Sequence, residues 1–215
     1  MKTRRSLFLM FCLLSGIALL LGGCGGSATS TPGTVGEWNP VITNAIGLYN
    51  GTIQTDDVDC FPTGCPTGQH KLMTRHDATI TINNTDNEGS TTAGKATNVT
   101  MSKYTIQYRR SETESQPAPV LSTRTVYQTF SLPPRVATTF SVDMIDIATK
   151  QEFSDQWLSS HAVPPDFPVR YTVIYTFYGN NAFGNVECVV TIDVRLGNFI
   201  SLAGTSGTVS TCVAN

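Results

Sequence analysis

The amino-acid sequence predicts an all-β protein built as an antiparallel β-sandwich. Charged residues make up only 14% of the chain, and 31 residues are threonine, a β-branched residue that favours strands. From residue 78 onward, short runs of alternating apolar and polar residues are separated by turn residues, which is the pattern of half-buried strands. Because each such strand has one apolar face, we expect two sheets that bury these faces against each other.

Residues 1–23 are predicted to be a secretory signal peptide. A basic start, MKTRR, precedes an apolar stretch at residues 7–21, which small residues follow. Ser15 and Gly16 interrupt this stretch, and crossing a bilayer takes about 20 consecutive apolar residues. We therefore expect a cleaved signal rather than a membrane-spanning helix.

The signal ends in the run Leu21-Gly22-Gly23-Cys24, which resembles the lipobox of bacterial lipoproteins. The resemblance implies transfer of diacylglycerol to the Cys24 sulfur, cleavage before Cys24, and acylation of the new amino group, typically with palmitate. Two or more acyl chains anchor a protein stably to a membrane. In this family an Asp after the cysteine is the usual inner-membrane retention signal, so Gly25 favours the outer membrane in a diderm cell.

Residues 24–36 are predicted to be a flexible tether between the lipid and the folded part. They are rich in Gly, Ser and Thr and carry no charge, a composition typical of linkers.

The mature chain keeps four cysteines besides Cys24, namely Cys60, Cys65, Cys188 and Cys212. An exported protein meets an oxidising environment, so we expect two disulfides, for which three connectivities exist. The favoured pairs are 60–65, closed by a Pro- and Gly-containing turn, and 188–212. A zinc site at Cys60, Cys65, His70 and His76 is the alternative, and its spacing is too short for a zinc finger.

Residues 37–215 are predicted to form a single domain. Its first segment, residues 37–77, is apolar without a clean period and predicts an N-terminal strand and a long loop. A strand is then predicted over residues 78–82. The apolar positions of residues 99–108 change parity, which predicts one strand with a bulge near Ser102 and Lys103.

Further strands are predicted at residues 121–130 and 136–147, on either side of Pro133-Pro134, because proline cannot sit in a central ladder. Residues 150–161 predict a short helix, with Phe153 and Trp157 on one side.

The clearest pair of strands covers residues 169–177 and 186–196, joined by the loop 179–185 as a hairpin. One or two edge strands are predicted around residues 199–202 and 208–213. The strand order from about residue 48 to 196 resembles that of immunoglobulin-like and fibronectin type III sandwiches. The antibody spacing of cysteines is absent. The chain is also similar to small exported lipoproteins with an immunoglobulin-like domain and no assigned activity.

Candidate catalytic and metal residues are few. Three histidines are present, His70, His76 and His161, and the Gly-x-Ser-x-Gly elbow of serine hydrolases is absent. His76-Asp77 is a candidate oriented base, for which a strand start with both side chains in water is the simpler interpretation.

Two acidic segments are candidate calcium sites. The run Asn84-x-Asp86-x-Glu88-Gly89 resembles the first half of an EF-hand loop, but its twelfth position is Lys95 instead of glutamate. The second cluster is Asp56, Asp57 and Asp59. We expect solvated loops at both places, with no catalytic residue, no metal and no cofactor.

The sequence therefore predicts a membrane-anchored envelope lipoprotein that acts as a binding or scaffolding module without catalysis. A calcium- or zinc-binding module and an envelope hydrolase are the alternatives. A net charge of −2 without a basic run gives no footprint for nucleic acid. Loops at 83–95, 111–119 and 179–185 are the expected contacts. Phe183, a phenyl in a Gly- and Asn-rich loop, is the candidate contact for an envelope protein or glycan partner, unless its loop folds back to cap the sandwich.

Overall fold

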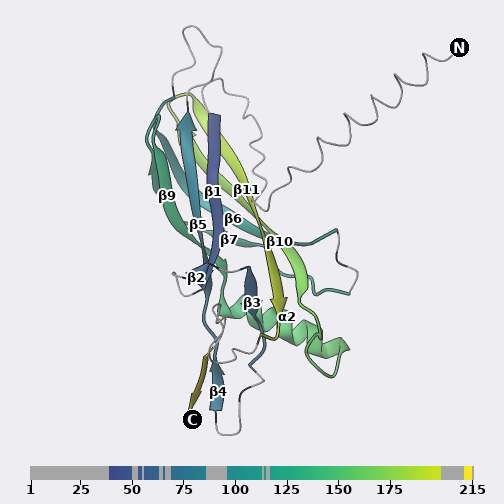
Figure 1. The fold of residues 1–215 in the computed structure, drawn as a ribbon. Coiled ribbons are helices and arrows are strands. Elements are labelled where there is room, and N and C mark those ends of the chain that lie inside the picture. Colours follow the sequence, from purple (N-terminus) through teal and green to yellow (C-terminus); the bar gives the residue numbers. More distant parts are fainter. Residues whose placement is uncertain are drawn as a thin grey trace, which may run out of the picture.

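The computed structural model is an all-β sandwich with a helix at one end, as the sequence predicts (Figure 1). It describes residues 39–49, 53–54, 56–62, 65, 69–85, 96–112, 114, 117–199 and 211–214. The predicted signal peptide, Cys24 and the tether lie outside these residues. Within the described part of the chain, no helix is both long and apolar enough to span a membrane.

The first sheet has the strand order β2-β1-β5-β9, and all its neighbouring strands are antiparallel. Its strands are β1 (Asn39–Tyr49), β2 (Ile53–Gln54), β5 (His76–Thr85) and β9 (Ala137–Ile145).

The second sheet has the order β3-β11-β10-β6-β7, and β8 also pairs with β6. Its strands are β3 (Asp57–Asp59), β6 (Val99–Arg110), β7 (Arg124–Val126), β8 (Phe130–Leu132), β10 (Val169–Asn181) and β11 (Gly184–Gly197). Strand β3 runs parallel to β11. A separate antiparallel pair joins β4 (Gln69–Leu72) to β12 (Thr211–Ala214).

The chain crosses between the two sheets, since β1, β5 and β9 belong to the first sheet and β6, β7, β10 and β11 to the second. Helix α2 (Ile147–Ser160) makes the crossover from β9 in the first sheet to β10 in the second.

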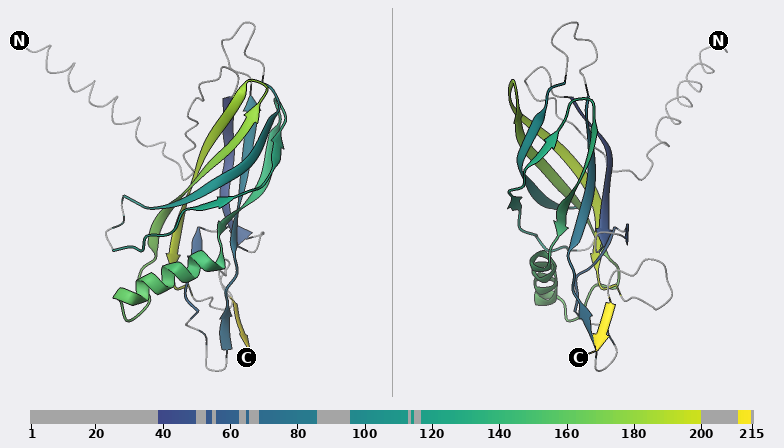
Figure 2. Two further views of the ribbon diagram at one scale, coloured as in Figure 1. Left: turned by 180° about the vertical axis from the view of Figure 1, so that it is seen from behind. Right: turned by 90° about the vertical axis from the view of Figure 1, so that its left-hand side faces the viewer.

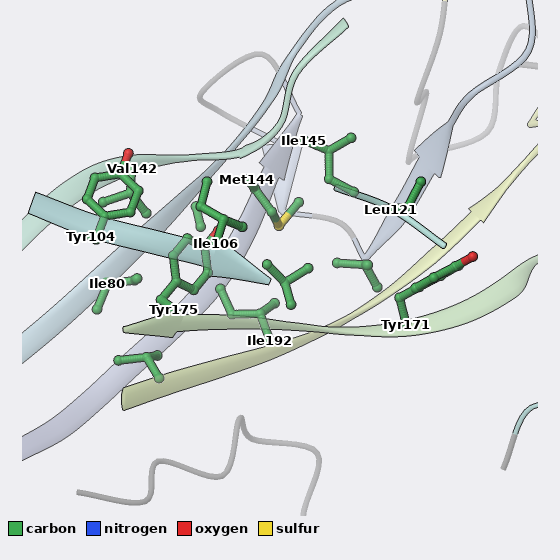
Figure 3. Close-up of a cluster of buried hydrophobic side chains, with 14 of the residues drawn as sticks. Ile80, Tyr104, Ile106, Leu121, Val142, Met144, Ile145, Tyr171, Tyr175 and Ile192 are labelled. Carbon is green, nitrogen blue, oxygen red and sulfur yellow. The ribbon is translucent and has the colours of Figure 1, made fainter. Parts of the chain in front are cut away.

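The core lies between the two sheets (Figures 2 and 3). Strand β10 shows the predicted alternation, with every second side chain buried: Val169, Tyr171, Val173, Tyr175 and Phe177. Burying one such side chain contributes roughly 1.5–3 kcal/mol. Strands β5 and β11 alternate in the same way, so the period-two pattern is confirmed where it was clearest.

The β10–β11 hairpin is confirmed, but its loop is shorter than the sequence suggests. The two strands continue to Asn181 and Gly184, which leaves Ala182 and Phe183 at the tip. The Asn181 side-chain oxygen accepts hydrogen bonds from the N–H groups of Phe183 and Gly184, at 2.9 and 3.1 Å. Gly184 has a φ of 142°, which side-chain-bearing residues rarely adopt. The local hydrogen bonds therefore extend the ladder into the predicted loop.

The predicted bulge in β6 lies at Ser102. Tyr178 of β10 is opposite Lys103 and Gly179 is opposite Met101, so Ser102 is the extra residue. A Cβ atom on Gly179 would overlap the carbonyl oxygen of Thr100. Glycine is therefore required where the two backbones approach beside the bulge.

A second bulge lies in β9, where Met144 has no partner between the pairs His76–Ile145 and Asp77–Asp143. Tyrosine hydroxyl groups from the opposite sheet form hydrogen bonds with the backbone of Asp143 and Met144 at this bulge. Tyr104 accepts a hydrogen bond from the Asp143 N–H, and Tyr175 donates to the Asp143 carbonyl. Tyr108 donates to the Met144 carbonyl at 2.7 Å.

Helix α2 follows this bulge directly and starts at Ile147, three residues before the predicted helix. Asp146 is its N-cap and accepts a hydrogen bond from the Thr149 N–H at 2.8 Å. Phe153 and Trp157 are buried side by side, as predicted. The helix covers the end of the sandwich at which β9 ends and β10 begins (Figure 1).

The predicted strand at 121–130 is confirmed only in part, since β7 and the first residue of β8 are the only residues of this range in strands. The N–H groups of Val120 and Ser122 bond to side chains of α2, Gln156 and Glu152, instead of a neighbouring strand. The N-terminal segment holds β1 as expected, and the predicted long loop is broken by β2, β3 and β4. Of the predicted C-terminal strands, β12 agrees with the second.

The sandwich has two distinct ends (Figure 2). The tether end holds Asn39, the first described residue, with Thr85 opposite it, the β8–β9 turn and the β10–β11 tip. The helix end holds α2 and the connection after Arg110. The loops predicted at 83–95 and 179–185 thus leave the tether end, whereas 111–119 leaves the helix end.

Candidate functional site

A buried polar cluster lies where β3, β4 and α2 meet beneath the sandwich. Its centre is an ion pair between Asp59 and Lys71, whose Oδ2 and Nζ atoms are 2.8 Å apart with side chains 1% and 0% exposed. The other oxygen of Asp59 accepts hydrogen bonds from the N–H groups of Phe61 and Phe199, both at 3.3 Å. Lys71 also donates to the Asn198 side chain at 2.6 Å. The pair is therefore hydrogen-bonded on both sides, as a buried charge requires.

Lys150 of α2 adds a second buried amine to this cluster. Its side chain is among the largest fully buried ones. Burial lowers the pKa of Lys150, the nearby Cys60 and Asp59 oppose this shift, and the positive charge of Lys71 adds to it. Burial raises the pKa of Cys60 to about 12. The cluster therefore holds a neutral thiol and no solvent-accessible nucleophile.

His76 lies in the same region and does not form the predicted pair with Asp77. Its side chain is fully buried, and burial, assisted by the charge of Lys150, lowers its pKa to about 3. Asp77 lies on the opposite face of β5 and pairs with Arg75 at 3.3 Å. Successive residues of a strand face opposite sides, so the two side chains cannot act together. The expectation that both are in water is wrong for His76.

The predicted disulfides 60–65 and 188–212 are wrong, because Cys60 and Cys188 are free and buried. Each side chain is directed into the core. The N–H of Cys60 donates to the Gly197 carbonyl at 2.9 Å, which holds this segment against the second sheet. Cys188 occupies an inward position of β11 between Val186 and Val190. Cys65 is disulfide-bonded, and the side chain of Cys212 lies outside the described part.

The candidate metal ligands are engaged elsewhere. Arg195 pairs with Asp56 and Asp57, at 3.2 and 2.7 Å, while Asp59 faces Lys71. Asn84 is buried, and its amide donates to the carbonyls of Thr97 and Leu132.

The remaining candidate ligands fall partly outside the described residues, which include the backbone of His70 but neither its side chain nor residues 86–95. In the described part of the chain, no three His, Cys, Asp or Glu side chains gather as a metal site.

His161 caps the end of α2 and stacks on Trp157, with ring centres 4.2 Å apart. Tyr178 is partly buried and contacts Lys103, whose Nζ is 5.2 Å from the ring centre.

Phe183 lies at the tip of the β10–β11 hairpin, at the tether end. Its side chain is 49% exposed, and the hydrogen bonds of Asn181 fix the backbone of the tip beneath it. The alternative in which this loop folds back over the sandwich is therefore wrong.

A second set of exposed apolar side chains lies on α2, on the segment bonded to it and on the connection that follows it, and sequence reasoning missed it. We call it the helix-end patch, made of Val120, Leu158, Val163 and Phe167. Val120 and Phe167 are 82% and 72% exposed. The Gln156 side chain accepts a hydrogen bond from the Val120 N–H at 3.0 Å and donates one to the Val120 carbonyl at 2.9 Å. The Trp157 indole donates to the Val163 carbonyl at 2.9 Å. The signal was available, since apolar residues in the Pro-rich run HAVPPDFP have no periodic strand or helix to join.

No protein-family model, no curated protein and no solved structure matches this chain.

Proposed function

We propose that this protein is a lipid-anchored lipoprotein of the cell envelope whose sandwich is a binding or scaffolding module without catalysis. The helix-end patch is the observation that carries the proposal. Apolar patches exposed on a folded domain mark interaction sites more often than they serve the fold. The patch is built on a capped helix whose inner face is packed, so it is presented in a fixed form.

The position of the patch suits a tethered protein. The chain enters the sandwich at Asn39, and β1 runs from there toward the helix end. A strand of this length spans roughly 35 Å at about 3.3 Å per residue. A lipid anchor at Cys24 would therefore leave Phe167 and its neighbours on the far side from the membrane. The partner that fits this surface is another envelope protein, with a glycan as the alternative.

The alternatives have less support. Calcium ligands at Asp56 and Asp57 face Arg195, and the zinc candidates Cys60 and His76 are buried in the core. Stoichiometric calcium or zinc in the purified mature protein would replace our proposal with the metal-module function.

Two measurements test the proposal in cells that produce the full chain. Mass spectrometry of the mature protein should find an acylated Cys24 as the first residue, and Cys24→Ala should abolish both the acylation and the cleavage, so that residues 1–23 stay on the chain. A photo-crosslinking phenylalanine analogue at Phe167 should capture a defined partner in the intact envelope.

The same analogue at Tyr127, which is 80% exposed but outside the patch, is the matched control. Val163→Asp should abolish the Phe167 crosslink without changing the amount of protein. Equal crosslinks from Phe167 and Tyr127, or none that depends on Val163, would refute a binding role for the patch.

A further inference from the structure

We propose that the tether end of the sandwich rests on the lipid surface, with Phe183 and Val136 in the membrane interface. This proposal rests on the proposed lipid anchor at Cys24 and names the bilayer itself as the partner of the Phe183 site. Strand β11 begins directly after Phe183, and Val136 lies in the turn before β9. Both side chains are about half exposed.

Both side chains lie at the end at which the tether joins the fold. The N–H of Arg135 donates to the carbonyl of Asn84, which places the Val136 turn beside the end of β5 and hence near Asn39. The hairpin tip is at this end because Asn180 pairs with Thr100, next to Val99, whose partner Leu132 precedes the same turn. Figure 2 shows this end opposite α2.

The reach of the tether restricts which part of the molecule meets the bilayer. A flexible Gly- and Ser-rich chain the length of residues 24–36 has a typical end-to-end distance of about 20 Å. This distance is shorter than the sandwich, so the tether end has a far higher effective concentration at the lipid surface than the helix end has. An apolar group held at that surface gains contact with the acyl boundary without a separate association step.

Phe183 is suited to this contact because its backbone is already ordered. Asn181 and the positive φ of Gly184 fix the tip, so little conformational entropy is lost when the ring enters the interface. Aromatic rings with polar neighbours are characteristic of the interface region, and Asn180, Asn181 and Asn185 surround this ring in the sequence.

A site-specific fluorophore on the lipidated full chain tests the proposal. Cys60 and Cys188 are buried free thiols, so a cysteine introduced by Phe183→Cys is the reactive position for a nitrobenzoxadiazole label. The protein is reconstituted in phosphatidylethanolamine and phosphatidylglycerol vesicles. We expect label 183 to gain severalfold in fluorescence, and nitroxide-bearing lipids to quench it.

Two further labelled variants keep the test decisive. Val136→Cys leaves Phe183 in place and should give the same response if the whole end is in contact. Phe167→Cys, at the helix end, should stay water-like and unquenched. Water-like fluorescence at both 183 and 136 in protein that floats with the vesicles would overturn the proposal. Quenching at 167 as well would also overturn it, because the sandwich would then lie flat.

Failure of the anchor itself is recognised separately. If Cys24 is not acylated, the protein does not float with vesicles, and the proposed function fails at that step. A parallel sample replaces residues 1–24 with a histidine tag bound to a nickel-chelating lipid, which holds the tether at the same surface. Label 183 should respond there too, and its failure to do so would overturn the lipid contact regardless of acylation.

Discussion

The Lys71 ammonium lies 2.8 Å from the Asp59 carboxylate, and neither side chain reaches solvent. This ion pair connects β4 to β3, two short strands that belong to different sheets. Breaking one partner of a buried pair leaves an uncompensated charge, which costs about 3–5 kcal/mol. The structure of the β3–β4 region therefore depends on these two side chains.

We expect Lys71→Met to lower the free energy of unfolding by about 3 kcal/mol, since Asp59 would stay buried without its partner. Asp59→Asn alone should also destabilise the protein. The double variant should lose less than the sum of the single losses, because neither buried charge then remains. Urea unfolding of the mature chain measures all three, and purely additive losses would contradict the coupling.

His76 gives the protein a specific sensitivity to acid. Its pKa is about 3 in the folded protein and about 6.5 when unfolded, so between these values the unfolded chain binds the extra proton. Stability is therefore present above pH 6.5 and is lost as the pH falls toward 3. We expect His76→Leu to flatten this part of the stability profile. His161→Gln is the control, and an equal slope in wild type and His76→Leu between pH 6.5 and 4 would contradict the assignment.

The phenols that hold the β9 bulge should each contribute measurably to stability. Tyr104→Phe removes the acceptor of the Asp143 N–H, and Tyr175→Phe removes the donor to its carbonyl. Leaving a buried backbone group unpaired costs about 1–3 kcal/mol. The exposed Tyr127→Phe serves as the control and should stay within about 0.5 kcal/mol of wild type. Thermal or urea unfolding measures the differences, and three equal values would contradict the role of the bulge.

The cysteines should react in two classes. Cys60 and Cys188 are buried, and burial raises the pKa of each to about 12, so a maleimide should leave the native protein unmodified. In denaturant without reductant, these two thiols should react, while Cys65 should not. If Cys12 is removed with the proposed signal peptide and Cys24 is acylated, Cys212 is the partner expected for Cys65 by elimination. Peptide mapping checks this, and four reactive thiols before reduction would refute the bridge.

The alternation of apolar residues was sufficient to predict the strands that carry the core, from Ala78 to Ile82 in β5 and throughout β10 and β11. It also predicted the bulge at Ser102, because a change of parity within one strand has few other causes. Short strands such as β3 and β4 could not be predicted, since two to four residues give no period. Their pairing depends on β11 and β12, far along the chain.

The polar cluster shows what sequence reasoning missed and why. Lys150 lies on the same helix face as Phe153 and Trp157, at spacings of three and seven residues. Its burial could therefore have been predicted from the sequence. Lys71 offered no such pattern. The predicted disulfide between Cys60 and Cys65 is wrong because the Cys60 thiol faces the core. A short interval between two cysteines does not tell which thiol is buried in this way.

Strand pairing across the chain sets the order in which the protein can mature. Strand β3 pairs with β11, and β4 with β12, so two of the earliest strands have partners that are synthesised last. Such distant pairings slow folding, because the chain loses the entropy of closing a long loop before the new contacts stabilise it. Strand β3 therefore remains without its partner until β11 is available, and β4 until residue 214 is available, whereas β1 pairs with the nearby β2 and β5. A chain that crossed a membrane N-terminus first would thus keep β3 and β4 unpaired during translocation, and these strands would pair only after its C-terminus had crossed.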